Sequence, residues 1–84
     1  MALVTLIELG TKDRITVHGP TRCLYSVVEG TDGQKYLQLD TFGSDTRAIP
    51  DKVSQSIQFD RRAARQLLDL LRSTFPNLDA ESSA

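Results

Sequence analysis

Residues 53–75 read VSQSIQFDRRAARQLLDLLRSTF, and within this stretch the spacing of the apolar side chains changes from two to about 3.6 residues. The alternation at its start is typical of a strand with one apolar face. Asp60 follows directly, and its carboxylate is a good N-cap for the unpaired N–H groups of a first helical turn. A helix is therefore predicted from Arg61 to about Phe75, where Pro76 ends it.

Upstream of this stretch, short β-rich runs alternate with turn residues such as Gly10 and Gly30–Gly33. Strands are predicted at residues 2–9, 14–18, 22–28, 35–41 and 53–59. The sequence thus predicts an α+β fold, with a curved antiparallel sheet of four or five strands and one C-terminal helix packed on it. Residues 1–75 are expected to form a single domain, and residues 76–84 a disordered acidic tail.

The chain is short and nearly neutral, with 84 residues, 10 basic and 11 acidic side chains. This balance removes the simple argument for nucleic-acid binding by a strongly basic protein. In so short a domain the gain from apolar burial only roughly balances the lost chain entropy, and a single Cys excludes an internal disulfide. Self-association is therefore expected. The absence of a membrane-length apolar run and of a basic signal-peptide region predicts a cytoplasmic, non-membrane protein.

The predicted helix carries a wide apolar stripe. Its members recur at helical spacing and are Ala64, Leu67, Leu68, Leu71 and Phe75, with Leu70 widening the stripe. Two interpretations stay open: the helix is deeply buried in its own domain, or it pairs with the same helix of a second copy in an isologous contact. In the second case Leu67, Leu70 and Leu71 form the homodimer interface.

Three arginines crowd the start of the helix, where the helix dipole disfavours cations. Arg61 and Arg65 are also like charges four residues apart, which is a further small penalty. Together with Arg62 they are a candidate site for an anion or an acidic protein partner. The alternative is a set of ordinary solvated arginines, with Arg65 paired to Asp69.

The outward face of the predicted sheet and its loops combine cations, amides and an aromatic ring. A strand surface of this kind suits single-stranded nucleic acid, whose bases stack on aromatic rings while its backbone follows positive charge. The candidate contacts are Arg14, Arg22, Lys35, Tyr36, Arg47 and Lys52. A solvated sheet face without a ligand is the competing interpretation.

Catalysis is not expected from this sequence. His18 is the only histidine and Cys23 the only thiol, and nothing brings them within hydrogen-bonding reach of each other. Asp40, Asp45 and Asp51 supply the oxygen ligands that a hard divalent cation prefers, but their spacing matches no calcium loop. We therefore predict no cofactor and no metal, and leave these three aspartates as an open alternative.

Residues 36–71, YLQLDTFGSDTRAIPDKVSQSIQFDRRAARQLLDLL, follow the order strand, polar loop, strand and amphipathic helix. This stretch resembles the C-terminal single-strand-binding domain of the transcriptional positive-cofactor family and its short bacterial relatives. The matching positions are Leu37, Leu39, Phe42, Lys52, Ile57, Phe59, Leu67, Leu68, Leu70 and Leu71. Two positions depart from the family pattern, because Asp40 replaces a strand arginine and Gln55-Ser56 replaces a Lys-Gly pair.

The resemblance implies a homodimer joined through its helices, with curved sheets that offer channels for single-stranded DNA or RNA. The sequence thus favours a non-catalytic module that binds single-stranded nucleic acid and regulates transcription or another DNA transaction. The alternative is a protein-binding regulator that acts through the sheet edge, the long loop or the arginine cluster.

Overall fold

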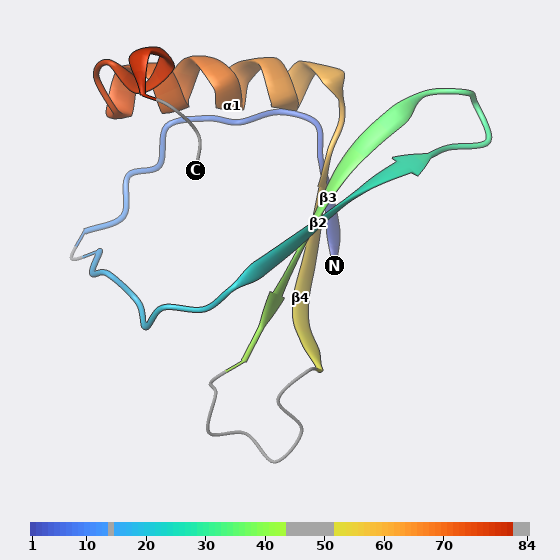
Figure 1. Ribbon diagram of the computed structural model, residues 1–84, viewed down its shortest axis with the longest axis horizontal. Helices are drawn as coiled ribbons and strands as arrows, with labels where there is room; N and C mark the ends of the chain where they lie inside the picture. Colours follow the sequence, from blue (N-terminus) through green and yellow to red (C-terminus); the bar gives the residue numbers. More distant parts are fainter. Residues whose placement is uncertain (14, 44–51, 82–84) are drawn as a thin grey trace.

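The computed structural model describes residues 1–13, 15–43 and 52–81. Its architecture is α+β, as the sequence predicted: an open sheet followed by one C-terminal α-helix (Figure 1). The elements of the described residues are β1 (Ala2–Val4), β2 (Cys23–Glu29), β3 (Lys35–Phe42), β4 (Val53–Phe59), α1 (Arg61–Thr74) and a short 3-10 helix, η1 (Leu78–Ala80).

The sheet is mixed rather than antiparallel, which corrects the sequence prediction. Its four strands lie in the order β1-β4-β3-β2 among the described residues, with β2, β3 and β4 antiparallel to their neighbours in turn. β1 pairs with β4 in parallel, placing Ala2 opposite Ile57 and Val4 opposite Phe59. The period-two pattern reports which side chains share a face but not the direction of the partner strand. The sequence therefore did not reveal this parallel pair.

The predicted strand at residues 14–18 is absent from the part of this segment that the structure describes, and the predicted strand at 2–9 is confined to β1. Residues 15–18 have a strand-like pattern but lie in the long connection from β1 to β2 (Figure 1). A strand needs a neighbour to satisfy its backbone groups, and the pattern does not say whether one is present.

The register divides the sheet into an apolar and a polar face. Leu37 lies opposite Phe59 and Val27, and Leu39 lies opposite Ile57 and Tyr25, so these side chains share one face. We call this surface the apolar face of the sheet; it consists of Tyr25, Val27, Leu37, Leu39, Ile57 and Phe59. The opposite face carries the amide, hydroxyl and carboxylate side chains of β3 and β4.

Asp60 connects β4 directly to α1 and caps the helix as predicted. Its Oδ1 accepts a hydrogen bond from the backbone N–H of Ala63 at 2.9 Å, and its own N–H donates to the carbonyl of Val4 at 3.3 Å. The first turn is packed tightly, because Ala63 is completely buried. One residue thus joins the end of β1, the end of β4 and the beginning of α1.

We expect replacement of Asp60 by alanine to lower the free energy of unfolding by about 0.5–2 kcal/mol, because the N–H groups of the first helical turn lose their cap. Urea denaturation followed by circular dichroism measures this change. Asp60→Asn retains an acceptor at the same position and is the matched control, with most of the stability kept. Equal losses in both variants would show that the carboxylate charge, and not the cap, stabilises this junction.

The segment expected to be a disordered tail is ordered in its described part. Leu78–Ala80 form η1, and the Arg72 Nε lies 3.0 Å from the Asp79 Oδ2. Asn77 adopts the left-handed conformation, with φ of 66°, at the turn that brings η1 into contact with α1. The acidic composition suggested disorder, but it did not reveal that Asp79 can reach Arg72 after a tight turn.

Candidate nucleic-acid interface

A ladder of hydrogen bonds crosses the polar face of the sheet from β4 to β3. The Gln58 Nε2 donates to the Gln38 Oε1 at 2.9 Å, and the Gln38 Nε2 donates to the Asp40 Oδ1 at 3.0 Å. The Ser56 hydroxyl donates to the same Asp40 oxygen at 2.6 Å. The polar ladder, as we call these four residues, holds its side chains in fixed orientations on a half-buried surface.

Two shallow grooves follow the polar ladder. One, of about 310 Å³, is lined by Gln38, Ser56 and Gln58 together with Leu3 from β1. The other, of about 420 Å³, shares Gln38 and Ser56 and continues past Asp40 towards Val53. The ladder thus forms the floor of a hollowed surface with hydrogen-bonding groups, and it is accessible to a flat polar ligand.

Tyr36 lies on this face at one end of β3, and a hydrogen bond fixes its hydroxyl. The Tyr36 Oη donates to the Asp32 Oδ2 at 3.1 Å, while the other Asp32 oxygen accepts the N–H of Gln34 at 2.9 Å. The bond to the Asp32 carboxylate, together with desolvation and the negative charges of Asp32 and Asp60, raises the pKa of Tyr36. The hydrogen bond to Asp32 thus favours the protonated phenol over the phenolate.

We expect Tyr36 to titrate above the ordinary tyrosine value of 10.0. Because its pKa is raised in the folded chain, its contribution to stability is complete below the unfolded value and is lost as the pH rises through the folded pKa. Absorbance titration of the phenolate in a Tyr25→Phe background isolates Tyr36. Adding Asp32→Ala should lower the pKa of Tyr36, whereas Asp69→Ala should leave it unchanged. A pKa that Asp32→Ala does not alter would contradict this assignment.

Arg22 and Lys52 lie at the opposite end of β3. The Arg22 guanidinium lies 4.5 Å from the centre of the Phe42 ring, which is a cation–π contact, and Phe42 itself is only 8% exposed. Phe42 lies opposite Val53 across the strands, so Lys52 is next to this pair. Two predicted cations thus lie near the end of β3 that is farthest from Tyr36, where the register shift between Thr41 and Phe42 interrupts the strand alternation.

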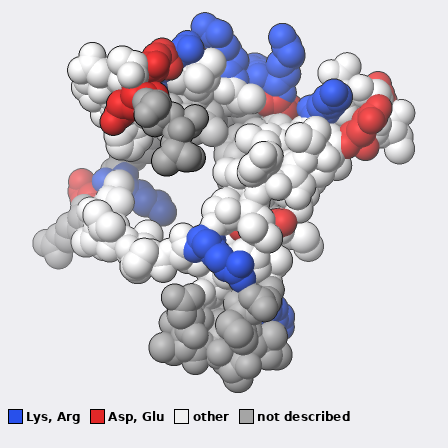
Figure 2. Space-filling view, in the orientation of Figure 1, with Lys and Arg blue, Asp and Glu red and all other residues white. Residues whose placement is uncertain are grey.

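One further predicted contact, Lys35, does not join this surface. Lys35 lies opposite Glu29 at the tip of the β2–β3 hairpin, on the face opposite to Tyr36 by strand alternation. Arg14 and Arg47 lie outside the described residues. On the face of the molecule that Figure 2 shows, the basic side chains of the described residues form several small groups. Tyr36, the ladder and the Arg22–Lys52 end therefore make up the candidate interface.

Intramolecular contacts occupy two members of the arginine cluster at the start of α1. The Arg62 Nε donates to the carbonyl of Thr5 at 2.7 Å, so this side chain anchors the connection that follows β1. The Arg65 Nη2 lies 3.6 Å from the Asp69 Oδ1, in an exposed pair one turn apart. Arg61 is exposed. These contacts favour a structural role for Arg62 over the partner-binding role predicted from the sequence.

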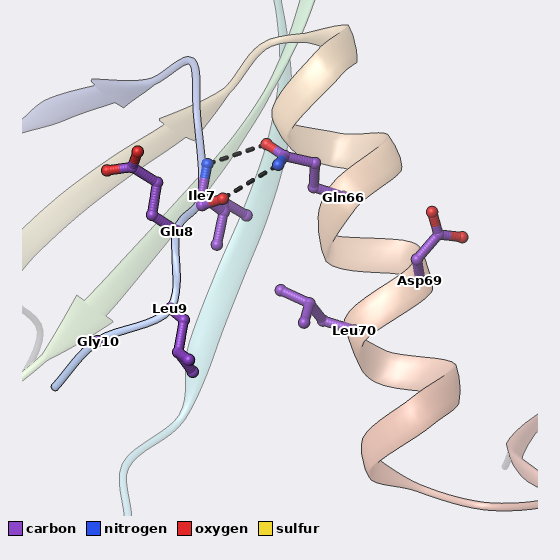
Figure 3. A pocket seen from close by; sticks show the side chains of 7 residues that line it. All are labelled: Ile7, Glu8, Leu9, Gly10, Gln66, Asp69 and Leu70. Atoms are coloured by element: carbon purple, nitrogen blue, oxygen red, sulfur yellow. Dashed lines mark hydrogen bonds between the residues drawn. The ribbon is translucent and has the colours of Figure 1, made fainter.

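Gln66 has a structural role that the sequence prediction missed. Its Oε1 accepts the N–H of Ile7 at 2.9 Å, and its Nε2 donates to the carbonyl of Ile7 at 3.0 Å. The amide thus holds the segment after β1 along the helix as a neighbouring strand would (Figure 3). The sequence contained one indication of this role, because Gln66 lies on the same side of the helix as the apolar residues Ala63 and Leu70, three residues before and four residues after it.

The predicted dimer leucines differ in their surroundings. Leu70 and Leu9 point into a groove of about 490 Å³ between α1 and residues 7–10 (Figure 3). Leu67 is half-buried, whereas Leu71 is exposed. Leu70 is therefore directed towards the chain's own N-terminal segment, on a different side of the helix from Leu71.

Asp45 and Asp51 of the open metal alternative lie outside the described residues. Within the described ranges, no group of three or more His, Cys, Asp or Glu side chains could hold a metal ion. The Asp40 carboxylate accepts hydrogen bonds from Gln38 and Ser56. Cys23, a free thiol, is exposed.

Comparisons of this chain with protein-family models, with curated proteins and with solved structures find no match. The resemblance to the positive-cofactor family accordingly stays a prediction. No helix in the described part of the chain is long and apolar enough to cross a membrane.

Proposed function

We propose that this protein is a non-catalytic module that binds single-stranded nucleic acid across the polar face of its sheet. The observation that carries the proposal is the row formed by Tyr36, the polar ladder and the Arg22–Lys52 end. Proteins bind single-stranded nucleic acid by stacking bases on aromatic rings, by hydrogen-bonding to base edges and by placing cations near the phosphates. The row offers all three kinds of group. Along β3 the row extends about 20 Å from Tyr36 to Phe42, at 3.3 Å per residue, and it includes Ser56 and Gln58 of β4 with Arg22 before β2 and Lys52 before β4.

Asp40 determines how a strand would lie on this surface. Its negative charge repels a phosphate, whereas its carboxylate, which accepts hydrogen bonds from Gln38 and Ser56, has further lone pairs for the amino group of a base. Base edges therefore lie over the ladder, with one base stacked on Tyr36. The phosphates lie towards the rim, where Lys52 is exposed and Arg22 is held on Phe42. This arrangement accommodates a ladder aspartate where the positive-cofactor pattern has an arginine.

Fluorescence anisotropy with labelled single-stranded DNA and RNA oligonucleotides tests the proposal. Affinity should fall with salt, with a slope of about 0.7 in log K against log salt for each phosphate contact that is lost. Lys52→Ala should reduce this slope by about one contact, whereas the exposed Lys12→Ala should leave it unchanged. No binding at low salt, or equal effects of the two lysine variants, would rule out the proposed surface.

One observation favours the alternative, a protein-binding regulator. β2 is the outermost strand of the sheet, so one row of its backbone N–H and C=O groups has no strand partner among the described residues. Such an edge can accept a strand from another protein. This function predicts a co-purifying protein that survives nuclease treatment and is lost in Val27→Lys, which puts a charge on the edge. Retention of the partner by Val27→Lys would exclude the edge as its site.

A further inference from the structure

The folded chain exposes much more surface than a compact monomer of its size. Its accessible surface is 7576 Å², whereas a monomeric protein of this mass exposes about 5,000 Å². Its radius of gyration is 15.1 Å, compared with about 12 Å for a compact domain of this length. Among the described residues the buried apolar side chains are Phe42, Phe59 and Ala63. The excess of about 2,600 Å² contains both polar and apolar surface, and Ile15, Val17 and Tyr25 are among the large apolar side chains exposed in it.

Two separate pieces of apolar surface bear on how a second chain could pack. One is the apolar face of the sheet, where Tyr25 is 75% exposed and Leu39 and Ile57 are only half-buried. The other is the outer stripe of α1, defined as Leu68, Leu71 and Phe75, all exposed on the side away from the bonded Gln66. The two pieces do not cover each other within one chain, because α1 extends beyond the end of the sheet (Figure 1).

The connection between β1 and β2 adds to this exposure. Leu9 and Val17 in it are almost fully exposed, at 96% and 99%. Together with α1 and β2, the connection surrounds an opening that passes through the molecule (Figure 2). Exposed apolar side chains such as Leu9 and Val17 beside an open space are unfavourable, because folded proteins pack to nearly crystalline density. We therefore expect a further element to pack against these exposed apolar side chains.

We propose that two copies of this chain form an obligate dimer by reciprocal packing of a helix on a sheet. The outer stripe of α1 in each copy covers the apolar face of the sheet in the other, in a two-fold symmetric contact. This differs from the helix-to-helix contact expected from the sequence, because Leu70 faces the groove beside Ile7 rather than the outer stripe.

Area and dimensions both favour a second copy as the occupant. An excess of about 2,600 Å² on each chain sets an upper bound of about 5,000 Å² on the total interface, well above the roughly 1,600 Å² of a standard stable interface. The 14 residues of α1 span about 21 Å, and the four strands of the sheet span about 14 Å at 4.8 Å between strands. The helix is thus long enough to cross the whole sheet. Charged side chains border both surfaces, with Glu29 and Lys35 at the hairpin end of the apolar face and Arg61 beside Leu68 on the helix.

Cross-linking tests the geometry of this dimer. By strand alternation Cys23 lies on the side of β2 that carries Tyr25, and its thiol is exposed. In a Leu71→Cys variant treated with a short bismaleimide, we expect a covalent dimer that requires both cysteines. Ser73→Cys, on the Gln66 side of the helix, is the matched control and should give no dimer. A dimer band that persists when Cys23→Ser is added to Leu71→Cys would place the two helices side by side and overturn the proposal.

Light scattering coupled to size exclusion gives an independent measurement on the unmodified chain. We expect twice the chain mass of 9.3 kDa at micromolar concentration, and a monomer would overturn the proposal. Phe75→Asp should shift the mass towards the monomer while circular dichroism still reports the helix. No nucleic acid is present in either experiment, so the dimer and the proposed binding function are tested separately.

Discussion

Replacement of Phe59 by alanine is expected to lower the free energy of unfolding by about 3–5 kcal/mol. Phe59 is one of the few buried side chains of the described chain, and it pairs across the sheet with Leu37 on β3 and Val4 on β1. It also lies next to Asp60, which begins the helix. A cavity at this position therefore separates three strands and α1 at once, with no other large buried side chain beside it to compensate.

The effect is large because small domains have little stability in reserve. At about 0.05–0.15 kcal/mol per residue, a chain of this length has a total of roughly 4–13 kcal/mol. Urea denaturation at one fixed protein concentration measures the loss, since a dimer makes the midpoint depend on concentration. Phe59→Leu keeps most of the apolar volume and is expected to cost less than about 1.5 kcal/mol. Similar losses for leucine and alanine would show that the aromatic shape, rather than burial, determines stability here.

Replacement of Tyr36 by alanine is expected to weaken binding of single-stranded nucleic acid by roughly 5- to 150-fold. Stacking of a base on an aromatic ring contributes about 1–3 kcal/mol, and Tyr36 is the aromatic ring on the exposed end of the polar face. Its hydroxyl is held by Asp32, so the ring is fixed before the ligand arrives and little rotamer entropy is lost on binding. Anisotropy titration at constant salt measures the change.

Tyr36→Phe separates stacking from hydrogen bonding at the same position. It keeps the ring but removes the donor to Asp32, so binding should stay within about a factor of two if stacking is the main contribution. Circular dichroism at the assay temperature establishes that both variants are folded. If Tyr36→Phe and Tyr36→Ala weaken binding equally, the hydroxyl and not the ring makes the main contribution. If neither variant changes the affinity, Tyr36 does not contact the nucleic acid.

The sequence predicted best where the chain has a regular period. The bounds of β4, the Asp60 cap and the start of α1 were all predicted correctly, because the period changes at one residue that is itself a strong cap. The alternation over β3 likewise predicted that Tyr36, Gln38 and Asp40 share a face. These features depend on local geometry, which the amino-acid pattern determines.

The features that the sequence missed depend on which segments meet. The parallel pairing of β1 with β4 and the hydrogen bonds between Gln66 and Ile7 join segments that are far apart in the chain. Residues 15–18 have a strand pattern but form no strand, because no neighbouring strand in the described part of the chain pairs with them. The candidate cations were equally hard to place, because Arg22 and Lys52 lie just outside their strands, where no period relates them to a face. A residue before a strand can lie at either face of its end.

Only one residue, Asp60, separates β4 from α1, so the direction of the helix depends on the backbone conformation at that residue. The residue is bonded to β1 and to the first helical turn, so the helix cannot change direction without a change in the twist of β4. Over the length of α1, a rotation of about 10° at Asp60 moves the far end by about 4 Å. Any ligand that alters the twist of β4 from the polar face is therefore mechanically coupled to the position of Phe75.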